Sequence, residues 1–252
     1  MHAVRRNDAR LRLTVACGAM LVAVSAAADQ PQAHEVAAGF DAAPQSLYWY
    51  SEAISALNRD MGKDGALLRV YGSVAVYEYA ATVGGGTIDG TLWQLDLMPG
   101  YQWVRGGVTF GGFVGLDYQQ SQLSPSDPTN AVRGTATGLK LEGHYYFDDE
   151  KQPFEASLVG EYSTAFDTYY AELRIGARVA DKLVVGPAAS VDGDTGYDAQ
   201  RLGGYATYAF ELTKDVPLEL TLVAGHQFVS SGGAGFGGGA GTFGTLEIDT
   251  DF

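Results

Sequence analysis

Apolar and polar residues alternate with a period of two along most of this chain. The clearest stretch runs from residue 169 to residue 180, where Leu173 and Ile175 share one face and Glu172 and Arg174 share the other. Successive side chains of a strand point to opposite sides of a sheet, so this segment has an oily face and a charged face. The pattern predicts an all-β protein whose strands are apolar on one side.

Twelve segments of this kind are predicted, and most are 10 to 14 residues long. A soluble β-sandwich also alternates, but its strands are usually about five or six residues long, whereas tilted membrane strands need roughly ten. We therefore expect a transmembrane antiparallel up-and-down β-barrel of about 12 strands. The segment 35–41 has the weakest pattern, and it is included because bacterial single-chain barrels have even strand numbers. The expected strands are 35–41, 47–57, 66–79, 90–103, 107–120, 134–147, 154–164, 169–180, 183–193, 199–210, 217–229 and 241–252.

Aromatic residues gather near both ends of the apolar faces, in a manner that resembles the interfacial girdles of membrane barrels. The chain ends at Phe252, with Leu246 and Ile248 on the same face, which is typical of an outer-membrane assembly signal. If Phe252 faces the periplasm, the external connections are 42–46, 80–89, 121–133, 165–168, 194–198 and 230–240. The expected girdles are Tyr101, Trp103, Tyr145, Phe147, Tyr208 and Phe210 at one end, and Tyr77, Tyr79, Tyr118, Tyr162 and Tyr169 at the other.

Residues 1–28 resemble a cleavable Sec-type signal peptide, which leaves 29–252 as the mature barrel. Arginines precede an apolar stretch at 13–24 that is too short to span a membrane, and Ala26, Ala27 and Ala28 offer small residues for cleavage. The leader holds four of the 16 basic and one of the 30 acidic residues, so the mature chain carries a formal charge of −17. This charge disfavours nucleic acid as a partner. We expect the outer membrane of a Gram-negative bacterium as the location and its lipids as partners.

Two motifs suggest ligand chemistry but have simpler explanations. The segment 233–238 satisfies G-x-G-x-x-G, yet no helix follows it, so we interpret 230–241 as a flexible loop. Asp192, Asp194 and Asp198 lie among glycines and hint at calcium, but the pattern of a calcium loop is incomplete and an Asp/Gly turn is favoured. We expect no metal and no cofactor.

The charged faces of the strands are expected to line the lumen and form an ion-pair network. The interpretations that remain open are a structural network that holds the barrel closed and a polar path or sugar-contacting surface. The expected network is Asp96, Lys140, Glu142, His144, Glu161, Glu172, Arg174 and Arg178, with Asp117, Glu155 and Arg201 on the same faces.

Several motifs together resemble the cellulose biosynthesis protein BcsS family, over about residues 35–252. The departures are His226, where a tyrosine is expected, and a plain glycine-rich loop at 230–241. The resemblance implies a role in cellulose production or export, with the cellulose chain or the export machinery as a partner, and it assigns no catalytic residue. The motifs are DGALLR at 64–69, DLMPGYQW at 96–103, LSPSDP at 123–128, VRG at 132–134, YSTAFDTYY at 162–170, DAQRLG at 198–203 and GHQFV at 225–229.

Three functions are compared on these grounds. The favoured one is a non-enzymatic outer-membrane accessory protein of cellulose biosynthesis or export, and the alternative is a general cation-preferring porin for small solutes. A barrel-type lipid hydrolase or protease is third, because no G-x-S-x-G or H-E-x-x-H occurs and His144 is expected to be a hydrogen-bonded lumen residue. Candidate polysaccharide contacts at the external edge, which could equally be girdle anchors, are Asp167, Tyr169, Tyr170, Asp198 and Arg201.

Overall fold

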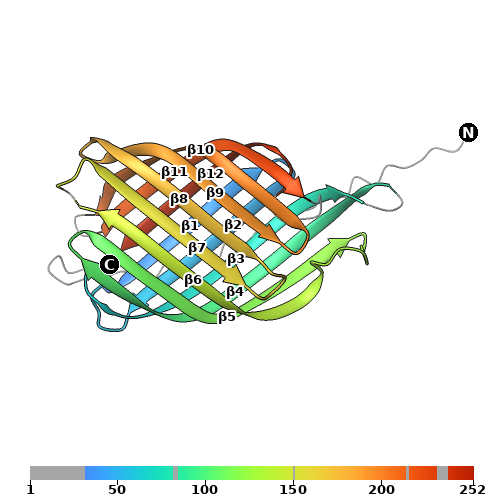
Figure 1. Cartoon of the computed structure of the whole chain (residues 1–252), viewed down its shortest axis with the longest axis horizontal. Helices are drawn as coiled ribbons and strands as arrows, with labels where there is room; N and C mark the ends of the chain where they lie inside the picture. Colours follow the sequence, from blue (N-terminus) through green and yellow to red (C-terminus); the bar gives the residue numbers. More distant parts are fainter. Residues whose placement is uncertain (1–31, 82–84, 150, 214–215, 232–237) are drawn as a thin grey trace, which may run out of the picture.

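Twelve antiparallel strands close into one barrel in the computed structural model, in which residues 32–81, 85–149, 151–213, 216–231 and 238–252 are described (Figure 1). Each strand pairs with its neighbours in the chain, so the topology is up-and-down, as the alternation predicted. The expected signal peptide lies outside the described residues, among which no helix is long and apolar enough to cross a membrane. The strands are β1 (His34–Ala43), β2 (Ser46–Ala56), β3 (Gly65–Ala80), β4 (Thr87–Arg105), β5 (Val108–Ser124), β6 (Gly134–Asp148), β7 (Phe154–Ser163), β8 (Tyr169–Ala180), β9 (Leu183–Asp194), β10 (Tyr197–Thr213), β11 (Val216–Ser231) and β12 (Gly241–Asp251).

The first and last strands close the barrel. β1 pairs with both β2 and β12, and Phe40 lies opposite Leu246 in the register. At the end of this seam the backbone N–H groups of His34 and Phe252 each donate to the other residue's carbonyl oxygen at 2.8 Å. The weakly patterned segment 35–41 is therefore confirmed as a strand. We call the end of the barrel that contains these two residues the turn end, and the opposite end the loop end.

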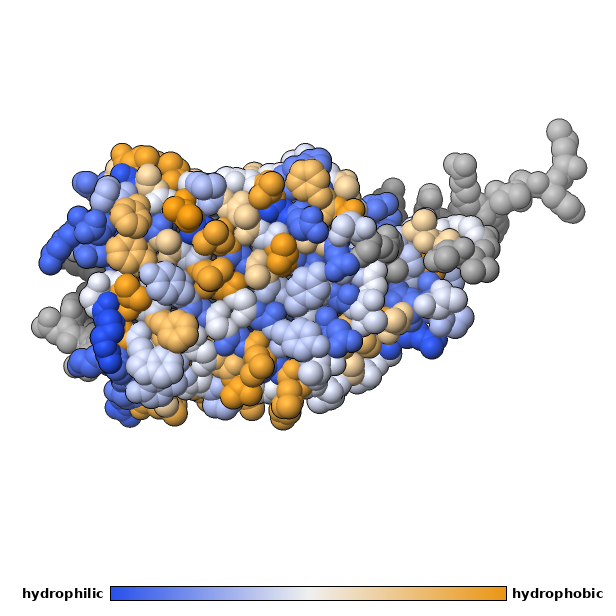
Figure 2. Space-filling view, viewed as in Figure 1, coloured by the Kyte–Doolittle hydropathy of each residue, from blue (hydrophilic) through white to orange (hydrophobic). Residues whose placement is uncertain are grey.

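The outward faces of the strands are apolar. On β4, Trp93, Leu95 and Leu97 are 52%, 58% and 53% exposed, while the alternate residues Asp96 and Met98 are fully buried. Figure 2 shows orange apolar side chains over the strand faces and blue polar ones at the two ends of the barrel. Burying such side chains in lipid is favourable by roughly 25 cal/mol for each Å² removed from water, so this face suits a membrane.

Two of the expected girdle tyrosines were placed on the wrong face. Tyr77 and Tyr79 are 3% and 4% exposed and point into the barrel. The strict alternation of β3 explains this, because Arg69 is buried in the interior and every second residue from it points the same way. Outward tyrosines near the same end are Tyr118 and Tyr162, at 43% and 44% exposure.

The strand limits shorten two expected loops. β5 continues to Ser124, so the predicted connection 121–133 shrinks to 125–133. The acidic segment 194–198 is a tight turn in which the N–H of Gly196 donates to Asp194 Oδ1 at 2.7 Å. Such Asp side-chain bonds to nearby backbone are common in turns. The glycine-rich motif at 233–238 lies almost wholly outside the described residues.

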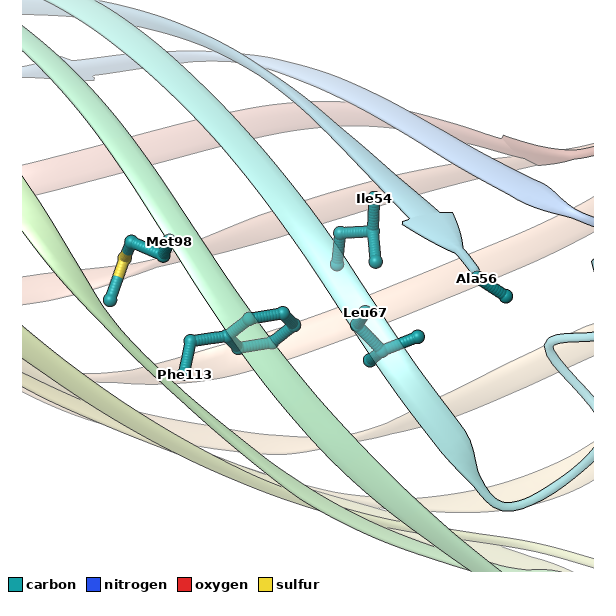
Figure 3. Close-up of a cluster of buried hydrophobic side chains, with 5 residues drawn as sticks. All are labelled: Ile54, Ala56, Leu67, Met98 and Phe113. Carbon is teal, nitrogen blue, oxygen red and sulfur yellow. The ribbon is translucent and has the colours of Figure 1, made fainter. Parts of the chain in front are cut away.

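A small apolar core fills the interior near the turn end, between β2 and β5. Figure 3 shows its buried side chains, which lie on four neighbouring strands. The β2–β3 connection folds inward beside them, because Gln102 Nε2 donates to the carbonyl oxygens of Met61 and Lys63 at 2.7 and 3.0 Å. This part of the barrel is thus filled with protein. The core consists of Ile54, Ala56, Leu67, Met98 and Phe113, with Met61 packed against it.

Candidate functional site

The lumen contains a cavity of about 560 Å³. At the loop end its lining begins with Leu92, Gln119 and Thr168, and at the turn end it reaches Asp148 and Asp251. Its volume lies within the range of roughly 300–1,000 Å³ that is usual for small-molecule sites. Among the described residues, the lining includes thirteen acidic side chains and only three arginines, Arg69, Arg174 and Arg201. The cavity is therefore strongly acidic and disfavours anionic solutes.

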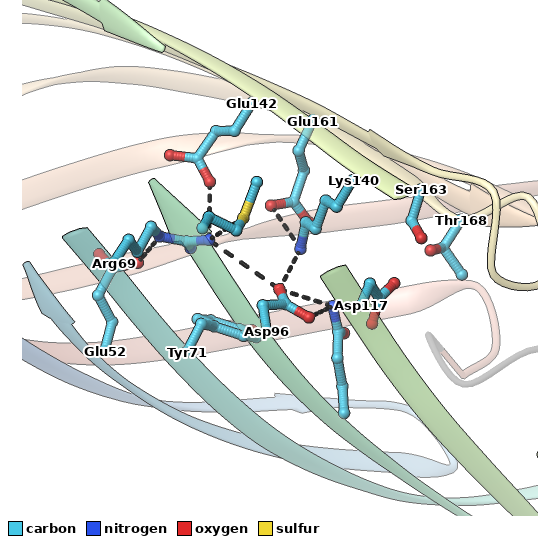
Figure 4. Close-up of polar contacts among 12 residues, drawn as sticks. Glu52, Arg69, Tyr71, Asp96, Asp117, Lys140, Glu142, Glu161, Ser163 and Thr168 are labelled. Carbon is cyan, nitrogen blue, oxygen red and sulfur yellow. Dashed lines mark hydrogen bonds and ion pairs between the residues drawn. The ribbon is translucent and has the colours of Figure 1, made fainter. Parts of the chain in front are cut away.

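Arg69 of β3 joins acidic residues on both sides of it (Figure 4). Its guanidinium is paired with Glu52 of β2 and, across the interior, with Glu142 of β6 at 2.9 Å. Asp96 of β4 lies 4.0 Å from the same guanidinium. An arginine with only 6% of its side chain exposed needs such partners, because an unpaired buried charge is very costly.

Lys140 of β6 continues this cluster toward β7. Its ammonium contacts Asp96 Oδ2 and Glu161 Oε2, both at 2.9 Å, and its side chain is only 2% exposed. The same ammonium lies 5.1 Å from the ring centroid of Tyr71, close enough for a cation–π contact. The predicted set Asp96, Lys140, Glu142 and Glu161 therefore forms one cluster, which Arg69 completes.

Arg174 of β8 forms a second cluster with the opposite wall. Its Nη1 lies 2.6 Å from Glu247 Oε2 of β12, and its Nε lies 2.8 Å from Glu172 Oε1. Tyr50 of β2 donates its hydroxyl to Glu247 Oε1 at 2.9 Å. Glu247 thus ties β2 and β8 to the seam strand β12 through the interior.

Arg201 of β10 forms a third cluster nearer the loop end. Its Nη1 and Nη2 donate to the two carboxylate oxygens of Asp41 on β1 at 2.9 and 3.2 Å, and its Nε donates to Gln227 Oε1 at 2.6 Å. Asp192 of β9 lies 3.9 Å from the same Nε, and Asp192 Oδ1 accepts no hydrogen bond from the described residues. The guanidinium group of Arg201 on β10 therefore links this strand to β1 and β9.

Of the remaining members of the predicted network, Arg178 and Glu155 lie apart from these clusters, and His144 borders the first one. Arg178 is paired with Asp148, and Glu155 lies 3.8 Å from it. His144 lies 4.0 Å from Glu142, and its ring packs against those of Phe113 and Tyr146. The lumen charges thus form separate clusters rather than one continuous network.

Sequence reasoning missed four residues that hold these clusters together: Arg69, Glu52, Glu247 and Asp41. The signal for Arg69 was present, since it alternates with outward Leu68 and Val70 on a clear strand. Its role depends on the register, which brings β3, β4 and β6 to one level and cannot be derived from the alternation alone.

The five candidate polysaccharide contacts lie in three different places. Tyr170 and Arg201 line the cavity with inward side chains, and Tyr169 also borders it. The ring of Tyr169 crosses Gly193 of β9, where any side chain would clash with it, and its hydroxyl donates to Asp198 of β10. Both residues alternate with the inward residues of their strands, so the pair lies toward the outer side of the wall, where Tyr169 still borders the cavity.

Asp167, the fifth candidate, is exposed in the β7–β8 turn. It accepts a hydrogen bond from the outward Tyr162 at 2.8 Å. Of the five candidates, the structure brings Tyr169, Tyr170 and Arg201 to one cavity, and Asp167 and Asp198 are not part of its lining.

The β7–β8 turn, residues 164–168, folds into the barrel and caps the cavity. It passes over Gly138 of β6, where a Cβ atom would clash with the backbone of Ala165. Phe166 then packs against the buried cluster that includes Tyr77 and Leu92 on the opposite wall. On the other side, Thr195 of the β9–β10 turn donates its N–H to the carbonyl oxygen of Phe166 at 3.0 Å. We call residues 164–168 the cap.

The β5–β6 loop packs beside the cap. Tyr79 donates its hydroxyl to Asp127 Oδ2 at 3.0 Å and accepts a bond from Asn130 Nδ2 at 2.9 Å. Hydrogen bonds from the side chain and backbone of Thr129 lower the pKa of the Asp127 carboxyl. The loop is therefore held to the barrel wall by an ionised aspartate.

The acidic lining of the cavity favours neutral or cationic ligands over anionic ones. His144, the residue weighed as catalytic, is only 7% exposed, and the rings of Phe113 and Tyr146 pack against it. No group of three or more potential metal-ligating side chains occurs in the part of the chain that the structure describes.

The closed strand order, apolar outer face and polar interior define a transmembrane up-and-down β-barrel. The family model for the cellulose biosynthesis protein BcsS matches residues 36–252, which include all but two residues of the barrel strands. The chain therefore belongs to the BcsS family, as the sequence motifs indicated. A comparison with curated protein sequences found no match.

Solved structures that resemble the chain are outer-membrane barrels. They include the KdgM porin in complex with disordered oligogalacturonate, with 10% identity, a TM-score of 0.42 and coverage of 86% of this chain and 99% of that one. The β domain of the Bordetella autotransporter BrkA gives 14% identity, a TM-score of 0.46 and coverage of 88% and 100%. The low-pH structure of OprB from Pseudomonas putida has 9% sequence identity and a TM-score of 0.29, and the match covers 88% of this chain and 92% of that one. At such low sequence identities and TM-scores, these similarities give no information about which solutes this protein binds or transports.

Proposed function

We propose that this protein is a non-enzymatic accessory component of cellulose biosynthesis or export that resides in the outer membrane after Sec-type export. The observation that carries the proposal is the match of the BcsS family model over residues 36–252, together with a closed barrel whose outer face is apolar. Its partners are then outer-membrane lipids and either the cellulose chain or the machinery that exports it.

The internal ion pairs support an accessory role over a wide diffusion pore. Arg174–Glu247 and Arg201–Asp41 join strands that are not neighbours, so these side chains occupy the lumen. The cap also packs across the loop end of the cavity. A steady and large flow of solute requires an open path, which these contacts obstruct.

A general porin with cation preference remains the second candidate, because acidic residues greatly outnumber arginines in the cavity lining. Fixed negative charge in a narrow space attracts cations and repels anions. Single-channel recording separates the two functions. A large and steady cation-selective conductance supports the porin, whereas a closed or barely conducting barrel supports the accessory role.

The third candidate, a barrel enzyme, has less support. Glu142, Phe113 and Tyr146 surround His144, which is a setting for a structural histidine rather than for a base beside a nucleophile. An enzyme of this kind predicts that His144→Ala abolishes a lipid- or peptide-cleaving activity.

The deciding experiment is deletion of the gene and complementation in a cellulose-producing host. We expect the protein to fractionate with the outer membrane and to migrate differently on gels before and after heating. Cellulose output should fall on deletion and return on complementation. Normal output in the deletion strain, or recovery of the protein as a soluble periplasmic species, contradicts the proposal.

A further inference from the structure

A row of hydrogen-bonding side chains follows the inner wall of the barrel across eight neighbouring strands. The strand register joins successive members directly, from β5 through the seam to β10, with Gly39 of β1 as the single gap. Every side chain in the row lines the cavity. We call this row the polar stripe, and its members are Gln119, Gln94, Ser73, Tyr50, Glu247, Thr221 and Thr207.

The polar stripe is largely uncharged although the cavity around it is strongly acidic. Its only ionised member, Glu247, is already paired with Arg174 and accepts a hydrogen bond from Tyr50. The other six side chains are amides and hydroxyls, which donate and accept hydrogen bonds without carrying charge. A ligand lying along the stripe therefore meets neutral polar groups.

Buried acceptor atoms at the loop end of the cavity have spare bonding capacity. Gln119 is 1% exposed, and its Nε2 donates to Asp117 Oδ2 at 2.7 Å and to Thr168 Oγ1 at 2.9 Å. The carbonyl oxygen of Ala165, 3.4 Å from Nε2, can only accept, and the Thr168 hydroxyl already donates to that carbonyl. The amide orientation is therefore fixed, and Oε1 is left without a donor among the described residues. Asp192 Oδ1 on β9, which also lines the cavity, likewise has no hydrogen-bond donor among the described residues. Buried acceptors normally have donors, so these atoms point to a ligand that supplies them.

Tyrosine rings beside the stripe add flat apolar surface. The rings of Tyr50 and Tyr71 are stacked with centroids 6.0 Å apart, and Tyr48 lies 6.1 Å from Tyr50. All three line the cavity. A ring of this kind offers an apolar face and a polar hydroxyl, and so matches a ligand with alternating flat faces and polar edges.

From these features we propose that the polar stripe binds a short segment of a neutral, hydroxyl-rich glycan chain. The chain enters the cavity from the turn end beside Asp148, Glu219 and Asp251, away from the apolar core. Neighbouring strands are about 4.8 Å apart, so the stripe presents a polar group at intervals comparable to the width of a sugar ring. The cap closes the opposite end, so the cavity holds a chain segment and is not a conduit for it. This proposal rests on the proposed function in taking a β-glucan as the specific ligand.

The test is isothermal titration of the full-length protein, purified in detergent, with cellohexaose. The double variant Gln119→Leu/Thr221→Val removes polar groups from the stripe while largely keeping the side-chain volume. We expect it to weaken binding by roughly thirtyfold, since each of the two lost hydrogen bonds contributes on the order of 1 kcal/mol. The matched control Gln122→Leu/Thr137→Val changes the same residue types on the outward faces of β5 and β6 and should bind as the wild type does.

Several outcomes overturn the proposal. They are no binding of cellohexaose to the wild type, equal binding by the stripe variant, and a site that takes calcium chloride but not the sugar. An oligogalacturonate of the same length is expected not to bind, because the acidic lining repels it. If deletion lowers cellulose output but the wild type binds no sugar, the stripe proposal fails and the proposed function stands. If the wild type binds sugar but deletion leaves output unchanged, the proposed function fails instead.

Discussion

Arg174 on β8 and Glu247 on β12 meet across the lumen, with Nη1 and Oε2 2.6 Å apart, although three strands separate them along the wall. Their side chains are 15% and 20% exposed. This pair braces the barrel at the level where β1 and β12 close it. Together with the buried apolar clusters, this ion pair joins opposite walls of the barrel and so helps to hold its cross-section.

Removing one partner of this brace should destabilise the barrel. Arg174→Met leaves Glu172 and Glu247 without their cation, so we expect the free energy of unfolding to fall by about 2–3 kcal/mol. Urea unfolding in lipid vesicles, followed by the loss of heat-modifiable migration on gels, measures the change. In the double variant Arg174→Met/Glu247→Gln the loss should be smaller than the sum of the two single losses. Additive losses would show that the two side chains are not coupled.

The cap should control conductance. Phe166→Ala removes the ring that packs against Tyr77 and Leu92, and so opens the loop end of the cavity. We expect a larger single-channel conductance in planar bilayers, with cations preferred over anions because the lining is acidic. Phe110→Ala, which removes an outward ring on β5, is the control and should conduct as the wild type does. An unchanged conductance in Phe166→Ala would mean that the cap is not the barrier.

Two adjacent leucines on β3 lie in different environments, one packed in the interior and one facing the lipid. Leu67 is 2% exposed within the inner core, whereas Leu68 is 38% exposed on the outer face. Leu67→Ala leaves a cavity and should cost about 2–4 kcal/mol of unfolding free energy. Leu68→Ala should cost less than half as much, because lipid chains rearrange around the smaller side chain. Equal losses in vesicle unfolding would contradict the assignment of the two faces.

The β5–β6 loop should loosen in acid. Bonds from Thr129 lower the pKa of Asp127, so its ionised form stabilises the folded loop. This contribution is present above the ordinary aspartate pKa of about 3.9 and is lost as the pH falls through the lower folded value. Limited proteolysis with pepsin should therefore cut the loop faster as the pH falls below about 4. Asp127→Asn should be cut readily across the whole acidic range. A cleavage rate in the wild type that does not change with pH would oppose this account.

The strands and their inward faces could be predicted because a period of two is a local property of the sequence. The limits of β6, β8 and β9 differ from those expected by no more than one residue. The errors arose where the apolar face had to be chosen from ambiguous residues. Tyr77 and Tyr79 suit an aromatic girdle by composition, but alternation from Arg69 places them inside.

The pairing of the interior charges could not be predicted from the sequence. Arg174 and Glu247 are 73 residues apart, and their contact depends on the curvature and stagger of the whole barrel. The inward position of the cap could not be predicted either, because no local sequence pattern indicates that Phe166 points into the barrel. Its φ of +54° and that of Asp167 at +52° are conformations that side chains rarely adopt, and they arise from tertiary packing.

The acidic lining of the cavity should concentrate cations inside the folded barrel. Far more carboxylates than guanidinium groups face one small enclosed volume, so folding gathers mobile counter-ions that the unfolded chain spreads through the solution. We therefore expect the folded barrel to be more stable at higher ionic strength, because counter-ions screen the repulsion among its carboxylates.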